Sequence, residues 1–426
     1  MGKRRQQRNS EESSGRDLRS TRSSQQAAAD IWLPALRVII CGHSTFRQSE
    51  EYVEAVLRAF NGSEDDRGYL ASGDDLDVDA RWFPACPAHR PEHHLAGALH
   101  TLVIILANAR LATDDEYRVW LEDSLDLVRM SKGRHRVLVL AETEVTVESF
   151  TARRSRLTQA QFLPCHVLSE QAVRPAHFGL IVLNEASRLV LRHIERRGTA
   201  KSRLFISHAK KDGLPLAIAI LNQLDELPHI NTFYDVRSLS LSDDWNRELQ
   251  EGVAASVVIV IRTAEYDNRP YCVKELRWAD KFACPVVVVD ASNRLSRPRS
   301  DLPLTDVVTV VMRDGNLLRV IYAALREGLR AALLSRTVQQ LQQKNVIRQP
   351  FAVLHRAPTA ASIRHACELN RNSDVSSEQG DRNLLLIYPE PVLPDSELES
   401  FTALANYYRD GTQLLTLNQL MASKGL

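Results

Sequence analysis

The side chains best placed for chemistry lie in the segment YCVKELRWA, residues 271–279. If this segment is a helix, its spacing places Glu275 on the same stripe as Cys272 and Leu276, beside groups that face inward. A carboxylate held there could stabilise a positive charge that develops in a transition state. The alternative is a glutamate on the helix surface that forms an i,i+4 contact or none.

A second candidate is the loop SHAKKDG, which runs from Ser207 to Gly213. We expect it to join a strand to a helix, whose N-terminus presents free backbone N–H groups and a partial positive charge. Lys210 and Lys211 add two mobile ammonium groups, so the loop, with Ser207 and His208, could cradle a pyrophosphate. A solvated turn that happens to carry lysines is the alternative.

Three further side chains belong to the same group of site candidates. Asp235 either orients the loop that follows it or is an ordinary turn carboxylate. Trp245 either lines the site or packs the next helix, and packing is the simpler interpretation. Cys272 is expected to pack rather than to act as a nucleophile, because no base can be assigned to it.

The segment CPAHRPEHH contains Cys86, His89, His93 and His94, which are residue types that bind zinc. The four side chains lie in a Pro-rich stretch without a second ligand cluster. We therefore expect a plain loop here and no metal site.

These candidates need a sheet edge to bring them together, and the pattern of residues 202–335 predicts one. Short β-rich runs alternate with amphipathic stretches, which indicates parallel strands covered by helices on both faces. The predicted strands are 204–207, 232–235, 257–261, 285–290 and 307–312, and the predicted helices are 214–227, 244–255, 271–281 and 316–334. This order predicts a flavodoxin-like doubly wound sheet, which binds ligands at the carboxyl ends of its strands.

Residues 36–197 show the same alternation. The predicted strands are 37–41, 101–106 and 136–140, and the predicted helices are 50–60, 117–129 and 178–196. Several segments match across the two units: RVIICGHS matches RLFISHAK, TLVIILANA matches SVVIVIRTA, and RVLVLAET matches PVVVVDAS. An old duplication explains these matches. Two unrelated doubly wound domains would also look alike at this level.

The remaining segments carry no readable chemistry. Residues 1–30 are polar and predict a disordered tail without a secretory signal. Residues 346–426 predict a small α/β segment. The net charge of +1 does not suggest a nucleic-acid or membrane partner, and the six cysteines, which form no CxxC pair, favour a reducing cytoplasm.

Residues 201–335 resemble the TIR (Toll/interleukin-1 receptor) domain family at four places in the family's order. These are LFISHAKKDG, FYDVRSLSLSDDW, the strand and helix of AASVVIVIRTAEYDNRPYCVKELRWA, and PVVVVD. The resemblance is to the NAD-cleaving TIR effectors of bacterial immune systems. It implies NAD+ as substrate without any required cofactor, Glu275 as the catalytic carboxylate that engages the ribose next to nicotinamide, and activation by self-association.

Two departures from the family pattern stand out. Leu241-Ser242-Asp243 replaces the glycine that often precedes the second helix of the family, so positive-φ conformations cost more in this loop. In the first unit, counting back from its last matched strand places Asp126 opposite Glu275, with Glu122 one turn away. Neither has the Tyr-Cys-x-x-Glu setting, so we expect the first unit to be a degenerate, non-catalytic TIR-like partner that could sense a nucleotide or a protein.

Two functions remain open at this point. One is an NAD+ glycohydrolase or cyclase that releases nicotinamide and an ADP-ribose product. The other is a non-catalytic TIR scaffold that assembles partners. The Tyr-Cys-x-x-Glu motif favours the enzyme, and the absent loop glycine favours the scaffold.

Overall fold

The computed structural model describes most of the chain outside its N-terminal segment and several loops. The described residues are 32–43, 45–46, 48–61, 76, 78–143, 146–148, 161–165, 174–194, 202–225, 230–233, 245–292, 307–312, 315, 317–371 and 383–425. The tail expected at 1–30 and Asp235 lie outside them.

The first unit is a five-stranded parallel sheet with strand order β2-β1-β3-β4-β5. Its strands are β1 (Leu36–Gly42), β2 (Asp79–Phe83), β3 (His100–Ala107), β4 (His135–Ala141) and β5 (Gln161–Pro164). Its helices are α2 (Ser49–Asn61), α3 (Pro91–Leu95), the short η2 (Leu111–Thr113), α4 (Asp115–Met130) and α6 (Arg174–Ile194).

The second unit has an equivalent parallel sheet with strand order β7-β6-β8-β9-β10. Its strands are β6 (Ser202–His208), β7 (Ile230–Phe233), β8 (Val257–Arg262), β9 (Val286–Asp290) and β10 (Val308–Val311). Its helices are α7 (Leu214–Asp225), α9 (Trp245–Ala254), the short η5 (Tyr266–Asn268), α10 (Pro270–Lys281) and α11 (Leu317–Gln343). In both units the strands, taken in chain order, lie in the spatial order 2-1-3-4-5, so the predicted flavodoxin-like doubly wound fold is confirmed.

Each sheet is covered on both faces, which is why its central strands read as continuous apolar runs. Alternate residues of β1 face opposite sides, and Ile40 packs with α2 and α6 while Ile39 packs with α4. In the second unit Ile206 of β6 packs on the side of α7 and α11, and Phe205 packs on the side of α9 and α10.

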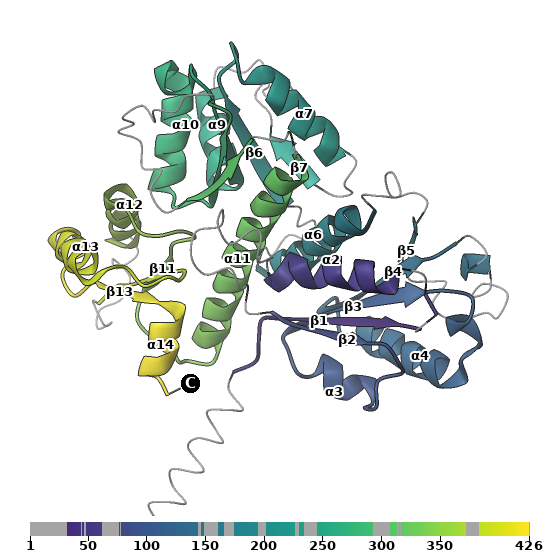
Figure 1. Ribbon diagram of the computed structural model, residues 1–426. Coiled ribbons are helices and arrows are strands. Elements are labelled where there is room, and N and C mark those ends of the chain that lie inside the picture. Colours follow the sequence, from purple (N-terminus) through teal and green to yellow (C-terminus); the bar gives the residue numbers. More distant parts are fainter. Residues whose placement is uncertain are drawn as a thin grey trace, which may run out of the picture.

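Helices α6 and α11, which follow the last strand of each unit, pack against one another between the two sheets (Figure 1). Most of α6 is buried because α2 covers one side and α11 another. Arg326 of α11 is fully buried and donates from Nη1 to the backbone oxygen of Ala59, at 3.0 Å. The Tyr322 hydroxyl donates to the backbone oxygen of Arg58. Side chains of α11 thus cap carbonyls in the last turn of α2, where helices lack their own donors.

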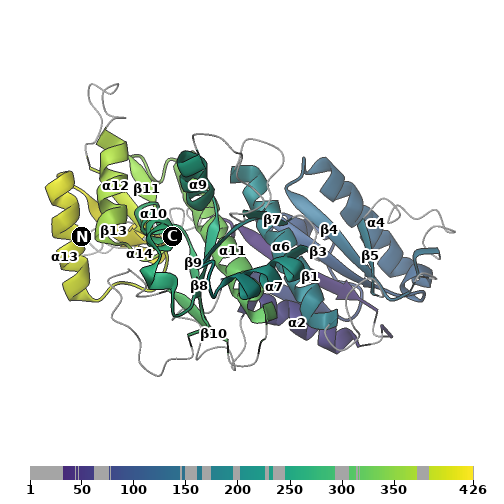
Figure 2. The same ribbon diagram turned by 90° about the horizontal axis from the view of Figure 1, so that it is seen from above.

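The C-terminal segment forms a third, three-stranded parallel sheet of order β11-β12-β13, which lies on the other side of α11 (Figures 1 and 2). Its elements are β11 (Phe351–Val353), α12 (Ala360–Arg371), β12 (Leu385–Tyr388), α13 (Asp395–Tyr408), β13 (Gln413–Thr416) and α14 (Leu417–Ser423). The predicted helix 316–334 is too short at its end: α11 continues to Gln343, and its later turns pack against this third sheet through Val338 and Leu341.

The sequence analysis missed β2, β5 and α3, which are short elements without a strong apolar run. Among the described residues, no helix is long and apolar enough to span a bilayer. The structure describes all six cysteines, and they form no disulfide with one another.

Candidate active site

The site is built where β6 and β8 end. Ser207 and His208 are the last residues of β6, and they pair with Val260 and Ile261 of β8. After β8 the chain passes through η5 and enters α10 at Pro270, where proline is favoured because its missing N–H costs nothing in the first turn. The carboxyl ends of two neighbouring strands and the start of α10 therefore meet at one edge of the sheet.

Glu275 is buried at this edge, with a relative exposure of 7%. Its Oε2 accepts a hydrogen bond from Ser207 Oγ at 2.5 Å, and Ser207 Oγ lies 2.7 Å from the hydroxyl of Tyr266. Because the single hydroxyl proton of Ser207 goes to the carboxylate, Tyr266 is the donor to Ser207. Glu275 is therefore held by a chain of donors and is not a glutamate of the helix surface.

The Tyr266 phenol stays protonated and can therefore donate a hydrogen bond. Burial raises its pKa well above the usual range, and the neighbouring Glu275 carboxylate raises it further. Its oxygen also lies 3.4 Å from the backbone oxygen of Cys272, another acceptor. A phenol that stays protonated keeps Ser207 oriented toward Glu275.

A cavity of about 560 Å³ opens in front of the Glu275 carboxylate. It is lined by His208, Ala209, Lys210, Lys211, Leu249, Arg269, Tyr271, Cys272 and Glu275. The structure thus brings five of the predicted site residues around one cavity, and it places a sixth, Ser207, directly behind the carboxylate. It gives no position for the side chains of Asp235 or Trp245: Asp235 lies outside the described residues, and Trp245 is known only as the first residue of α9.

Lys211 forms an ion pair at the edge of the cavity. Its Nζ lies 2.8 Å from Oε1 of Glu265, and Arg269 Nη2 lies 3.4 Å from the other oxygen of that carboxylate. The Lys211 hydrogen bond and charge lower the pKa of Glu265. Lys211 is nevertheless 63% exposed, and an ion pair in such a setting is worth little, so a bound anion could compete for the ammonium.

Sequence reasoning missed Arg269 and Tyr271 as residues that line the cavity. They flank Pro270 at the start of α10, and Tyr271 is 56% exposed although it is a large aromatic residue. Pro270 could have indicated both residues. Proline is common in the first turn of a helix, and in a doubly wound sheet a helix that follows a strand begins near the carboxyl ends of the strands, where ligands bind. Cys272 is buried, and its thiol donates to the backbone oxygen of His208 at 3.4 Å.

In the first unit, Asp126 is not the residue that corresponds to Glu275. When α4 and α10 are matched from their first residues, Trp120 corresponds to Glu275 and Leu111 to Tyr266, and the matched strands β1 and β6 pair Cys41 with Ser207. The match is supported by an equivalent contact, since Tyr117 OH donates to the backbone oxygen of Gly42 at 2.8 Å where Cys272 donates to that of His208.

Counting back from β4 gave Asp126 because α4 is longer than α10. Asp126 instead lies farther along α4, beside Arg129, and Glu122 lies beside Arg118. The first unit thus has Cys41, Leu111 and Trp120 where the second has Ser207, Tyr266 and Glu275, and it cannot form the same chain of donors.

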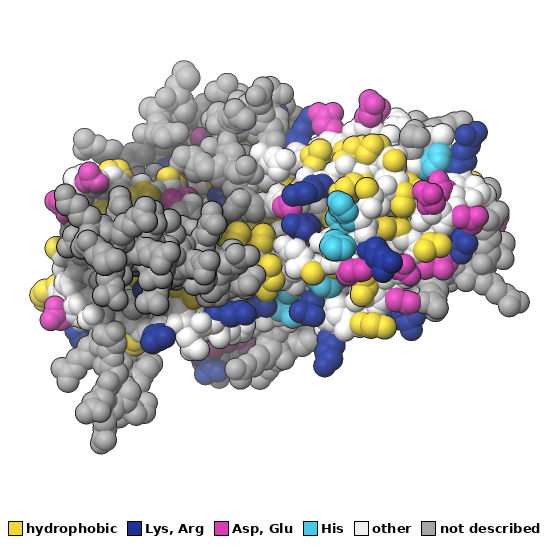
Figure 3. Space-filling view, turned by 90° about the horizontal axis from the view of Figure 1, so that it is seen from below, with side chains coloured by type: hydrophobic (Ala, Val, Ile, Leu, Met, Phe, Trp, Pro, Cys, Tyr) yellow, Lys and Arg dark blue, Asp and Glu magenta, His cyan; other side chains and the backbone are white. Residues whose placement is uncertain are grey.

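The histidine-rich segment is not wholly a loop, since Pro91–Leu95 form α3. His94 is buried, with its ring centroid 5.2 Å from that of Phe83 and 6.2 Å from that of Trp120. Figure 3 shows histidine side chains gathered on the underside of the molecule. Among the residues that the structure describes, no group of three or more His, Cys, Asp or Glu side chains is arranged to hold a metal ion.

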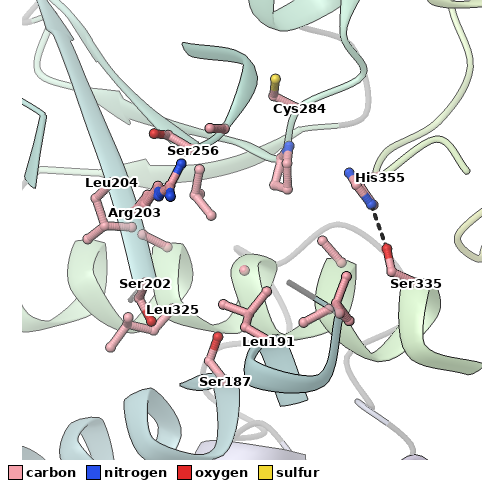
Figure 4. Close-up of a pocket in the computed structure, with 18 of the residues that line it drawn as sticks. Ser187, Leu191, Ser202, Arg203, Leu204, Ser256, Cys284, Leu325, Ser335 and His355 are labelled. Atoms are coloured by element: carbon pink, nitrogen blue, oxygen red, sulfur yellow. Dashed lines mark hydrogen bonds between the residues drawn. The ribbon is translucent and has the colours of Figure 1, made fainter. Parts of the chain in front are cut away.

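Another cavity, of about 240 Å³, lies near the first residues of β6 and β8, between α6 and α11 (Figure 4). Small apolar residues such as Ala324 and Gly328 form much of its wall, and a hydrogen bond of 2.8 Å joins Ser335 Oγ and His355 Nε2 at one side. It lies at the opposite end of the strands from Glu275 and contributes nothing to the site described above.

Comparison with known proteins bears on the second unit alone. A search of curated proteins found no match to the chain. A protein-family model described as "TIR domain" matches residues 204–318, which span β6 to the start of α11 and include Ser207, Tyr266 and Glu275. Residues 204–318 therefore form a TIR domain.

Proposed function

We propose that this TIR domain is an NAD+ glycohydrolase or cyclase, with Glu275 as its catalytic carboxylate. The observation that carries the proposal is the buried Glu275, which accepts from Ser207 at the wall of a cavity of about 560 Å³. A preorganised anion in a partly desolvated site stabilises a cationic transition state more strongly than water does.

The proposed reaction is cleavage of a glycosidic bond. The bond between ribose C1′ and the pyridinium nitrogen breaks, its electron pair leaves with nicotinamide, and positive charge develops on the ribose. Glu275 stabilises that charge. Water then adds to C1′ and loses a proton to give ADP-ribose, or a nitrogen of the ligand's own adenine attacks C1′ to give a cyclic product. No metal or additional cofactor is required for either route.

The other residues of the cavity have roles that fit the rest of the ligand. Lys210, Lys211 and Arg269 supply positive charge near the N-terminus of α10, which suits the pyrophosphate. Tyr271 presents an exposed ring at the same opening and could stack on a base. His208 and Cys272 form the floor and hold α10 against β6.

We further propose that self-association activates the enzyme. The cavity opens at the edge of the sheet, and a second TIR surface could exclude water from it and order its loops. The first unit, which lacks the carboxylate, would then sense a nucleotide or a protein and control assembly. Such an arrangement suits a bacterial immune effector, in which NAD+ loss in the cytoplasm follows infection.

The competing function is a TIR scaffold without catalysis. A scaffold would use the surface of the domain and would not require a buried carboxylate at a cavity. The two are separated by incubating the purified full chain with NAD+, with and without crowding agents, and measuring nicotinamide by mass spectrometry. Nicotinamide release that disappears in Glu275→Gln supports the enzyme, whereas an assembled protein that releases none supports the scaffold.

A further inference from the structure

The cavity of about 240 Å³ between α6 and α11 takes its wall from all three parts of the chain (Figure 4). Helix α6 belongs to the first unit, β6, β8 and α11 belong to the second, and His355 belongs to the C-terminal segment. Much of the wall is apolar, with Leu191, Leu204, Val257, Pro285, Ala324 and Leu325 among its residues. Such a wall favours the apolar body of a small ligand.

Four hydroxyl and thiol groups of the wall already have partners. Ser202 Oγ donates to Asn184, Ser256 Oγ and Cys284 Sγ donate to backbone oxygens of α9, and Ser335 Oγ is hydrogen-bonded to His355 Nε2. These groups therefore require no hydrogen bond from a ligand.

Three ionisable side chains line the cavity, and one of them is charged near neutral pH. Burial raises the pKa of the Cys284 thiol to about 12 and lowers the pKa of His355 to about 4, so both groups are neutral there. Arg203 is the third, and its guanidinium is always charged in proteins. No aspartate or glutamate is among the described residues that line the cavity, so the positive charge is not balanced at the wall.

Arg203 lies near the start of β6, and its side chain is exposed at the cavity. It forms no ion pair with any residue that the structure describes. In Figure 4, Arg203 and His355 lie on opposite sides of the cavity. A guanidinium offers two parallel N–H donors to a carboxylate, so Arg203 can hold the charged end of a ligand whose body lies in the cavity.

The size of the cavity and its single charge limit what can bind. A cavity of about 150 Å³ holds benzene, so one of about 240 Å³ accommodates a ring or a short chain that also carries a small polar group. An amine would be repelled by Arg203. A phosphate monoester would bring a second negative charge that the described wall does not pair. A neutral apolar molecule would leave Arg203 unused.

We propose that this cavity binds a small carboxylic acid whose body is a short aliphatic chain or a single ring. The carboxylate pairs with Arg203, and the body lies among the leucine, alanine and proline side chains of the wall. The site is independent of the NAD+ cavity, which lies at the other end of the strands. Because the three parts of the chain share the wall, an occupant stabilises their packing against one another.

The first test is calorimetric titration of the full chain with hexanoate, cyclohexanecarboxylate and benzoate. Hexanol, cyclohexylmethanol and benzyl alcohol are the matched probes, because each has the same body without the charge, and acetate is the acid without the body. We expect at least one of the three acids to bind, and its alcohol and acetate to bind about 10-fold more weakly or worse. No binding by any of the three acids, or equal binding by the matched alcohol, would overturn the proposal.

Two variants test the position of the ligand. Arg203→Gln should bring the affinities for an acid and its alcohol close together, whereas Arg110→Gln, at an exposed position of the first unit, should leave the preference for the acid unchanged. Ala331→Leu places a larger side chain at the wall and should prevent binding. Ala422→Leu, on the exposed side of α14, is its control, and circular dichroism checks the fold of each variant.

Hydrogen exchange then shows which backbone segments the acid protects. Exchange should slow at residues 254–257 and 324–335, which form the wall, when the tightest-binding acid is present. An unchanged preference for the acid in Arg203→Gln would overturn the proposal. Protection at residues 207–213 in place of the wall would do the same, because it would locate the ligand in the cavity of Glu275.

Discussion

Ser207 Oγ donates to Oε2 of Glu275 across 2.5 Å, although the two residues are 68 positions apart in the chain. The contact joins the end of strand β6 to the second turn of helix α10, and both side chains are buried. It gives the carboxylate a fixed orientation toward the cavity, and the predictions for catalysis start from it.

Replacing Glu275 by Gln keeps the shape of the side chain and removes its charge. We expect NAD+ turnover to fall by roughly two orders of magnitude or more while the chain still folds. Nicotinamide release measures the activity, and circular dichroism checks the fold. Glu251→Gln, on the exposed side of α9, is the matched control and should retain full activity. A Glu275→Gln protein that turns over NAD+ like the unmodified chain would exclude the assignment.

Ser207→Ala tests whether Ser207 positions the carboxylate. The substitution removes the donor to Glu275, and a hydrogen bond to a charged group accounts for about 10-fold or more in rate when it is lost. We expect kcat to fall by that amount with little change in KM. Tyr266→Phe leaves the Ser207–Glu275 hydrogen bond in place and should have a smaller effect on kcat. Equal losses in the two variants, or a change in KM alone, would contradict a positioning role.

Lys210 and Lys211 are expected to hold the phosphates of NAD+. Because phosphate contacts form equally in the ground and transition states, replacing both lysines by Ala should raise KM more than it lowers kcat. Steady-state kinetics separates the two constants. Arg247→Ala on α9, whose side chain pairs with Glu251 instead, controls for the loss of surface charge. An unchanged KM in the double variant would rule out this role.

Self-association is expected to switch the enzyme on. Specific NADase activity should rise with protein concentration over the range in which the mass distribution in solution shifts from monomer to assemblies, because a second copy excludes water and orders the site. Activity assays run beside mass photometry give both quantities. Activity per molecule that stays constant while the protein remains monomeric would leave a simple, always active hydrolase.

Acid should destabilise the packing around α11, which contacts His100 through Arg336 and His355 through Ser335. Burial lowers the pKa of His100 to about 3 and that of His355 to about 4, from 6.5. The unfolded chain therefore binds more protons than the folded one below pH 6.5, and the free energy of unfolding should fall as pH drops toward 4. Each histidine contributes about 1.4 kcal/mol per pH unit in that range.

His100 also accepts from Arg336 of α11 through Nε2, at 3.1 Å, and protonation of that nitrogen would place two cations in contact. Urea unfolding at several pH values measures the slope, and His100→Gln should flatten it. A slope that is the same in the variant would show that other groups control acid stability.

Local side-chain patterns were enough to predict the central strands of the two large sheets and the main helices that cover them. Apolar runs such as Val257–Ile261 predict buried parallel strands because both of their faces must be covered, and amphipathic stretches such as residues 50–60 predict the helices that cover them. Glu275 was placed beside inward-facing groups by helical spacing alone. The edge strands β2 and β5 were missed because DARWF and QFLP carry few of the apolar residues that mark a central strand.

Only the tertiary structure decided which residues meet. Periodicity shows which way a side chain faces on its own element, but not what lies opposite it. Ser207 and Tyr266 reach Glu275 because β6 and β8 are neighbours in the sheet, and Glu265 reaches Lys211 for the same reason. Trp120 replaces Asp126 as the counterpart of Glu275 because the two helices match at their starts and differ in length. Contacts between distant segments depend on strand order and packing, which no local pattern encodes.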